Sequence, residues 1–92
     1  MNAITLAGDL GPGRIDEVRE VIAEGLCLED RRPRLRINFE DVGHVHLGMV
    51  NVILRATAAA QARGGDVELV VDPDSDADRA FRLAGIVRTF RP

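Results

Sequence analysis

Short stretches of alternating apolar and polar residues are separated along this chain by longer stretches in which apolar residues recur every three or four positions. Alternation is clearest in residues 34–39 and returns in residues 66–71. A period of two is typical of a strand with one apolar face, whereas a period near 3.6 is typical of an amphipathic helix. The pattern therefore predicts strands that alternate with helices.

The predicted elements follow from these periods and from the residues that end them. Strands are expected at 4–7, 34–39, 66–71 and 86–90, and helices at about 14–28, from 47 to the Gly64-Gly65 pair, and at 76–84. Ser75 with Asp78 fits a capping box at the start of the last helix. The expected fold class is α/β, in the order β-α-β-α-β-α-β. Because the strands have one polar face, we expect a single-layer, four-stranded mixed sheet with helices mainly on one face.

Composition and charge narrow the function classes. A length of 92 residues predicts a single domain, 1–92. The composition, with 46% hydrophobic and 29% charged residues, is typical of a globular protein. A net charge of −3 and three aromatic residues argue against nucleic-acid binding. No apolar stretch approaches the roughly 20 residues that cross a bilayer, and no secretory leader is evident. These features predict a cytoplasmic protein that does not insert into a membrane.

Two histidines and one cysteine are the first candidates for chemistry. His44 and His46 stand two apart, so an extended segment would offer both imidazoles to one metal ion, but no third ligand is evident. Solvated or partner-facing histidines are the favoured interpretation. Cys27 near a helix end is interpreted as a small buried thiol, because the sequence places no base beside it.

Three charged or glycine-rich runs also have structural explanations. The alternating aspartates lack the glycine and the final carboxylate of a calcium loop and are interpreted as a turn and helix cap. The early glycines do not have the spacing of a phosphate-binding loop. The densest basic run, beside two acidic residues, is interpreted as a solvated turn and strand face, with an acidic partner surface as the alternative. The residues of these three runs are Asp72, Asp74, Asp76 and Asp78; Gly8, Gly11 and Gly13; and Arg31, Arg32, Arg34 and Arg36. We therefore expect no enzyme activity, no bound metal and no cofactor.

Taken together, residues 4–10, 37–42, 50–71 and 80–90 resemble a STAS domain, the fold of bacterial anti-sigma-factor antagonists and of sulfate-transporter tails. The strand ending Ala7-Gly8-Asp9-Leu10 is similar to the family's Gly-Glu-Leu-Asp pattern, and the run 80–86 to its Leu-x-x-x-Gly-Leu turn. The likeness covers nearly the whole chain. Many members have an extra strand before the first element and a helix after the last, so the resemblance implies a minimal version.

The resemblance also implies a switch that this chain lacks. In antagonists of the family, the second helix opens with Asp-Ser-Ser-Gly, and a kinase that is itself the anti-sigma factor phosphorylates the second hydroxyl residue. By position, this tetrad falls on residues 46–49, and the acceptor place is Gly48, which has no side-chain oxygen. Gly11 stands where the family has an acidic residue. No phosphorylation site is therefore expected, and Leu47 and Met49 are both expected to be exposed.

The resulting hypothesis is a protein-interaction module without phosphorylation control, resembling an anti-sigma-factor antagonist. Its partner is expected to be a protein, for example an anti-sigma-factor kinase. The alternatives are a STAS-type scaffold or regulatory subunit of a transporter, and a weak nucleotide-binding sensor; a homodimer is left open. The expected partner-binding residues lie in the loop and at the start of the second helix: His44, His46, Leu47, Gly48, Met49, Asn51, Val52 and Arg55.

Overall fold

A computed structural model of the chain describes residues 2–26 and 31–90. Strands and helices alternate as expected, with one short 3-10 turn added before the first helix. The first two strands are longer than predicted, so that His44 lies in the second strand and not in the expected loop, and the last strand is only two residues long. The elements are β1 (Asn2–Leu10), η1 (Pro12–Arg14), α1 (Ile15–Leu26), β2 (Arg34–Val45), α2 (Leu47–Ala62), β3 (Asp66–Val71), α3 (Asp76–Leu83) and β4 (Thr89–Phe90).

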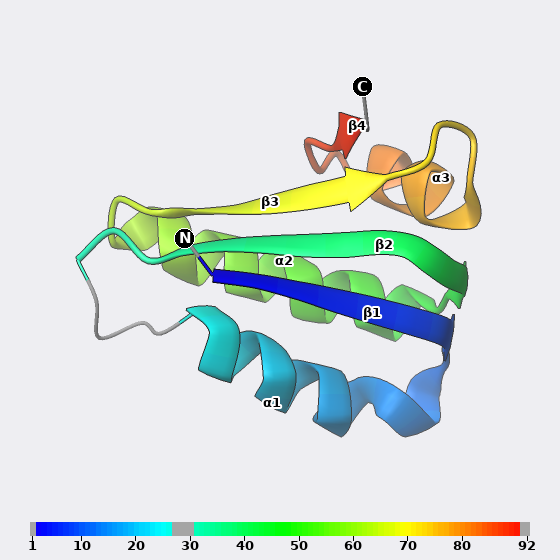
Figure 1. Cartoon of the computed structure of the whole chain (residues 1–92), viewed down its shortest axis with the longest axis horizontal. Helices are drawn as coiled ribbons and strands as arrows, with labels where there is room; N and C mark the ends of the chain where they lie inside the picture. Colours follow the sequence, from blue (N-terminus) through cyan, green and yellow to red (C-terminus); the bar gives the residue numbers. More distant parts are fainter. Residues whose placement is uncertain (1, 27–30, 91–92) are drawn as a thin grey trace.

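The four described strands form one sheet in the order β1-β2-β3-β4, and every neighbouring pair is parallel (Figure 1). The prediction of a mixed sheet was therefore wrong. Each of the first three strands is followed by a helix that returns the chain to the same end of the sheet, and such a crossover leaves the next strand parallel to the previous one. In this register Ile37 of β2 lies opposite Ile4 of β1 and Leu69 of β3.

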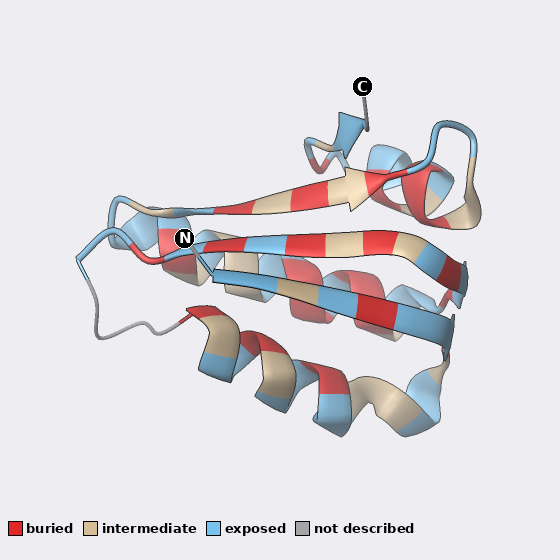
Figure 2. Ribbon diagram, viewed as in Figure 1, coloured by how far each residue is buried: buried red, intermediate tan, exposed pale blue. Residues whose placement is uncertain are grey.

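One face of the sheet is buried under the helices and the other face is open in the described part of the chain. In β2 the residues Leu35, Ile37 and Phe39 are buried, whereas Arg34 and Arg36, which alternate with them, are exposed. Figure 2 shows the same alternation as bands along the strands, and in Figure 1 the strands pass in front of α2. The expectation that helices cover mainly one face is confirmed by this burial pattern.

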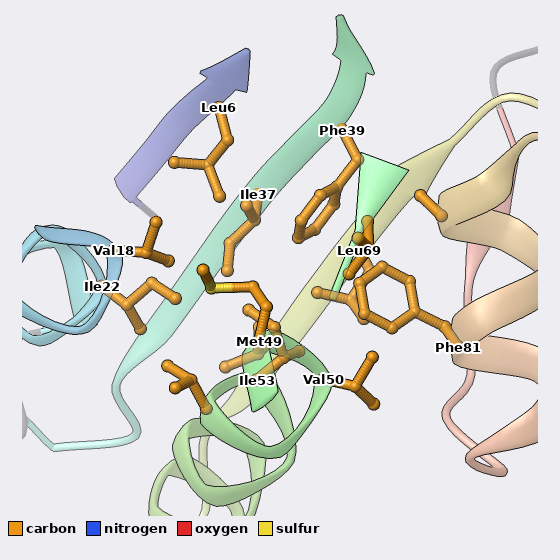
Figure 3. Close-up of a cluster of buried hydrophobic side chains, with 14 of the residues drawn as sticks. Leu6, Val18, Ile22, Ile37, Phe39, Met49, Val50, Ile53, Leu69 and Phe81 are labelled. Carbon is orange, nitrogen blue, oxygen red and sulfur yellow. The ribbon is translucent and has the colours of Figure 1, made fainter. Parts of the chain in front are cut away.

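The core lies between the buried sheet face and the three helices. Phe39 of β2 meets Phe81 of α3 edge to face, with ring centroids 4.9 Å apart and an angle of 67° between the ring planes. Such a pair adds about 0.5–1.5 kcal/mol beyond the area it buries. Figure 3 shows this pair beside side chains that α1 and α2 direct at the sheet, among them Ile22, Met49 and Ile53. Because α3 packs on the same face as α1 and α2, the helices form one layer.

The end of α2 is fixed by two glycines with different roles. Gly64 has a φ of +76°, a left-handed conformation that favours glycine after a helix. The amide of Gly65 donates to the carbonyl of Ala60, 2.9 Å away. A Cβ on Gly65 would overlap the backbone carbonyl of Pro33, so only glycine lets β3 start beside β2. The predicted stop at this pair is confirmed.

Candidate functional site

The start of α2 is organised by His46, which is the N-cap of the helix. Its backbone is extended, with φ −72° and ψ 149°, and its Nδ1 accepts a hydrogen bond from the amide of Gly48 at 3.0 Å. The backbone amide of His46 donates to the carbonyl of Leu10 at the end of β1, 3.0 Å away. A backbone N–H can only donate, so Nδ1 is the unprotonated nitrogen and a proton on the neutral ring lies on Nε2. His46 therefore joins the end of β1 to the start of α2.

His44, near the end of β2, has a different partner. Its Nδ1 is 2.9 Å from Oδ2 of Asp76, and the other carboxylate oxygen of Asp76, Oδ1, accepts a hydrogen bond from Arg79 at 2.9 Å. These two donors, His44 first, lower the pKa of Asp76 below its ordinary value. Within the described residues, no three His, Cys, Asp or Glu side chains gather closely enough to hold a metal ion. The two histidines thus serve α2 and α3 separately, and nothing in the geometry supports a shared metal.

Leu47 and Met49 point in opposite directions, which corrects the expectation that both are exposed. Leu47 is 74% exposed, whereas Met49 is fully buried in the core. Residues two positions apart on an α-helix are separated by about 200° around the axis, so when Met49 and Ile53 face the sheet, Leu47 must face solvent. Val52 is also buried, at 8% exposure. Of the expected partner-binding residues, Met49 and Val52 therefore belong to the packed interior.

The remaining exposed residues lie at the β2–α2 junction and along the first half of α2. Leu47, Asn51 and Arg55 follow one another at intervals of four along α2 and are all exposed, and His44 and His46 lie just before the helix. We call this the α2 tip surface, and it consists of His44, His46, Leu47, Asn51 and Arg55. The exposed Leu47 gives the α2 tip surface one large apolar side chain among polar residues, a combination common at protein contacts.

Gly48 lies half-buried beside this surface, where α1 approaches α2. A Cβ on Gly48 would lie 3.1 Å from Cδ1 of Ile15 and 3.3 Å from Nδ1 of His46. The position therefore lacks a hydroxyl and also has little room for one. The one hydroxyl on α2, that of Thr57, donates to the carbonyl of Ile53 at 2.9 Å within the same helix.

The fold has a clear counterpart among solved structures, although no protein-family model and no curated protein matches the chain significantly in sequence. It is similar to a structure described as the anti-sigma factor antagonist SpoIIAA in its unphosphorylated form, with a TM-score of 0.73. The fold is STAS-like. The match covers 98% of this chain and 79% of the SpoIIAA chain, at 19% sequence identity. This likeness establishes the fold that the sequence resemblance implied.

The aspartates in and after the loop before α3 belong to the N-terminus of that helix and do not form a calcium loop. The hydroxyl of Ser75 accepts from the amide of Asp78 at 3.2 Å, which is half of the predicted capping box. The carboxylate of Asp78 accepts from the amide of Asp74 at 2.9 Å and from Nε of Arg88 at 2.7 Å. The Asp74 amide first and Arg88 second lower the pKa of Asp78, against the opposing effect of burial.

The basic run and the early glycines have structural roles, and Cys27 cannot be placed. Arg36 pairs with Glu68 across β2 and β3 at 3.2 Å on the open sheet face. Near the early glycines, Arg14 donates to the carbonyls of Ala7 and Asp9, which closes the loop before α1. Cys27 lies outside the described residues.

Within residues 2–26 and 31–90, no helix combines the length and hydropathy that a bilayer crossing requires.

One feature that sequence reasoning missed is a groove between α1 and α2, next to the α2 tip surface. Its volume is about 450 Å³, and one end of it lies at Gly48. Its walls come from two helices more than twenty residues apart, so no local pattern indicates it. The only available signal was the number of small residues on α2, including Ala56 and Ala59.

Proposed function

We propose that this chain is a protein-interaction module of the anti-sigma-factor-antagonist type and that it binds a protein partner through the α2 tip surface. The observation that carries the proposal is Leu47, a large apolar side chain left 74% exposed at the first position of α2 on a STAS-like fold. Burial of an exposed leucine contributes about 1.5–3 kcal/mol to an association. The fold likeness to a regulatory antagonist supports binding, rather than catalysis, as the function.

The proposed module does not depend on phosphorylation of α2. A phosphate at a helix start adds about 1.5–2 negative charges where backbone amides can hold them, and so changes partner affinity. Gly48 offers no acceptor oxygen, its backbone amide is already bonded to His46, and the Thr57 hydroxyl is half-buried inside the helix. The module would therefore be able to bind its partner at all times. We also propose that it acts in the cytoplasm.

Affinity capture from lysate of the source cells, read by mass spectrometry, tests this proposal. The bait is the full chain, with Leu47→Asp as the test variant and Leu83→Asp as the matched control. Leu83 is 88% exposed at the end of α3, so both variants place one carboxylate at an exposed leucine. We expect one protein to be captured by the wild type and by Leu83→Asp but lost with Leu47→Asp.

The identity of the captured protein separates the partner classes. An ATPase-type anti-sigma kinase would indicate a phosphorylation-independent antagonist, and a transporter subunit would indicate a scaffold. Equal capture by Leu47→Asp and by the wild type would refute the α2 tip surface as the binding site.

A further inference from the structure

The groove between α1 and α2 is lined by residues along most of α1 and the first three turns of α2. α1 contributes Ile15, Ile22 and Leu26, and α2 contributes Val52, Ala56 and Ala59, at the three- and four-residue spacings that keep side chains on one side of a helix. The twelve residues of α1 span about 18 Å at 1.5 Å per residue, the length of roughly three helical turns. The groove is therefore a long apolar trough of about 450 Å³.

One arginine lines each wall of this trough, and α1 also carries the exposed carboxylates of Asp16, Glu17, Glu20 and Glu24. Arg19 stands on the α1 wall and Arg55 on the α2 wall. From Leu47 to Ala62, α2 contains no aspartate or glutamate. In the described part of the chain Arg55 has no ion pair or hydrogen bond, and Arg19 has only an exposed pair with Asp16 at 3.2 Å. Exposed ion pairs of this kind contribute little to stability, so both guanidinium groups are free to pair with a carboxylate of a partner.

We infer that the groove binds an amphipathic, acidic helix of a partner protein. The helix would place an apolar stripe against the partly exposed Ile15, Ala56 and Ala59, and aspartate or glutamate residues near Arg19 and Arg55. This inference rests on the proposed function, because the groove is continuous with the α2 tip surface through Asn51 and Arg55.

The shape of the groove favours a helix over other occupants. Both walls are helices whose backbone groups are bonded internally, so the groove offers no free strand edge to an extended peptide. Exposed residues such as Ala23 and Asn51 line it, which shows that it is open to solvent. A small anionic amphiphile needs a site that encloses most of its surface, and this trough does not.

Site-directed photo-crosslinking tests the groove and the α2 tip surface separately. The photo-reactive residue p-benzoylphenylalanine replaces Ala23 in the groove, Leu47 on the tip surface, or, as background, Arg34 on the open sheet face, each in the full chain. After irradiation in lysate of the source cells, the crosslinked partner segment is sequenced. We expect the Ala23 variant to crosslink above the Arg34 background to a segment with apolar residues at i, i+3, i+4 and i+7 and acidic residues beside them.

Other crosslinking patterns would overturn the inference in distinguishable ways. Crosslinking at Leu47 alone would leave the proposed function standing and refute the groove. Crosslinking at neither position would refute both. A segment from the Ala23 variant that is basic, or that lacks the helical period, would refute the acidic-helix occupant.

A charge reversal then tests the role of the arginine. The crosslinked segment is made as a synthetic peptide and titrated against the full chain by fluorescence anisotropy. Arg55→Glu should weaken binding at least tenfold, and Arg63→Glu, just over two turns along at the end of α2 and outside the groove, less than twofold. Replacing the peptide's acidic residues by lysine should restore binding to Arg55→Glu. Equal affinity of Arg55→Glu and the wild type would overturn the inference.

Discussion

The Nδ1 atom of His46 lies 3.0 Å from the backbone nitrogen of Gly48 and accepts its hydrogen bond, so an imidazole caps α2 where serine, threonine, aspartate or asparagine is usual. The resemblance to the STAS family places His46 on the aspartate of its tetrad. The histidine can thus supply the hydrogen-bond acceptor that the aspartate side chain would provide. Gly48, by contrast, leaves the position of the phosphorylated residue without a hydroxyl.

We expect His46→Ala to lower the free energy of unfolding by about 1 kcal/mol, the usual loss when a helix cap is removed. His46→Asn should keep most of the stability, because the asparagine side-chain oxygen can accept a hydrogen bond from the same Gly48 amide. Urea unfolding at neutral pH measures both variants. If His46→Ala were as stable as the wild type, the cap would have no energetic role.

Met49→Asp should unfold the protein, while Leu47→Asp should leave it folded. A carboxylate at the fully buried Met49 would lose its hydration without gaining a partner, whereas at Leu47 it would remain in water. We expect a loss above about 4 kcal/mol for Met49→Asp and a change within about 0.5 kcal/mol for Leu47→Asp. Circular dichroism during thermal unfolding compares the two, and similar losses would contradict the orientation of α2.

The contrast between these two residues shows how far the sequence alone could predict the site. Hydrophobic periods predicted the alternation of strands and helices and the end of α2, because these depend on neighbours in the sequence. Leu47 and Met49 are both apolar, so only the packing of α2 on the sheet decides which one is buried. His46 was missed as a cap because histidine seldom fills that role, and the groove because it depends on the distance between two helices.

Gly65→Ala should destabilise the fold far more than Gly11→Ala. A Cβ at Gly65 would overlap the carbonyl of Pro33, whereas a Cβ at Gly11 would meet nothing within 4 Å. Since Gly11 has a φ of −84°, alanine fits there without backbone strain and should be neutral or stabilising by about 0.4–1 kcal/mol. Urea unfolding midpoints of the two variants test this, and equal midpoints would contradict the packing of Gly65 on Pro33.

Asp78 should make the stability fall in acid. Its pKa is lowered, mainly by the hydrogen bond from the Asp74 amide and further by Arg88, so its stabilising contribution is present above the ordinary carboxyl pKa of about 4. That contribution is lost as the pH falls through the lower pKa of the folded state. Asp78→Asn should be less stable than the wild type at pH 7 and should lose less stability between pH 5 and about pH 2.

Asp72→Asn is the control for this pH dependence, because Asp72 is exposed just before the same loop. It should follow the wild-type dependence of unfolding free energy on pH. An Asp78→Asn variant with the same acid sensitivity as the wild type would show that the contacts of Asp78 with Asp74 and Arg88 do not contribute to stability.

Hydrogen–deuterium exchange of the full chain, with and without its captured partner, tests the central claim most directly. Slower exchange on binding should be confined to peptides that cover residues 44–55 and, if the groove is filled, the adjoining face of α1. The Leu47→Asp variant should lose this protection, and Leu83→Asp should keep it. Protection centred on the open sheet face around Arg34 and Arg36, with residues 44–55 unchanged, would contradict the account.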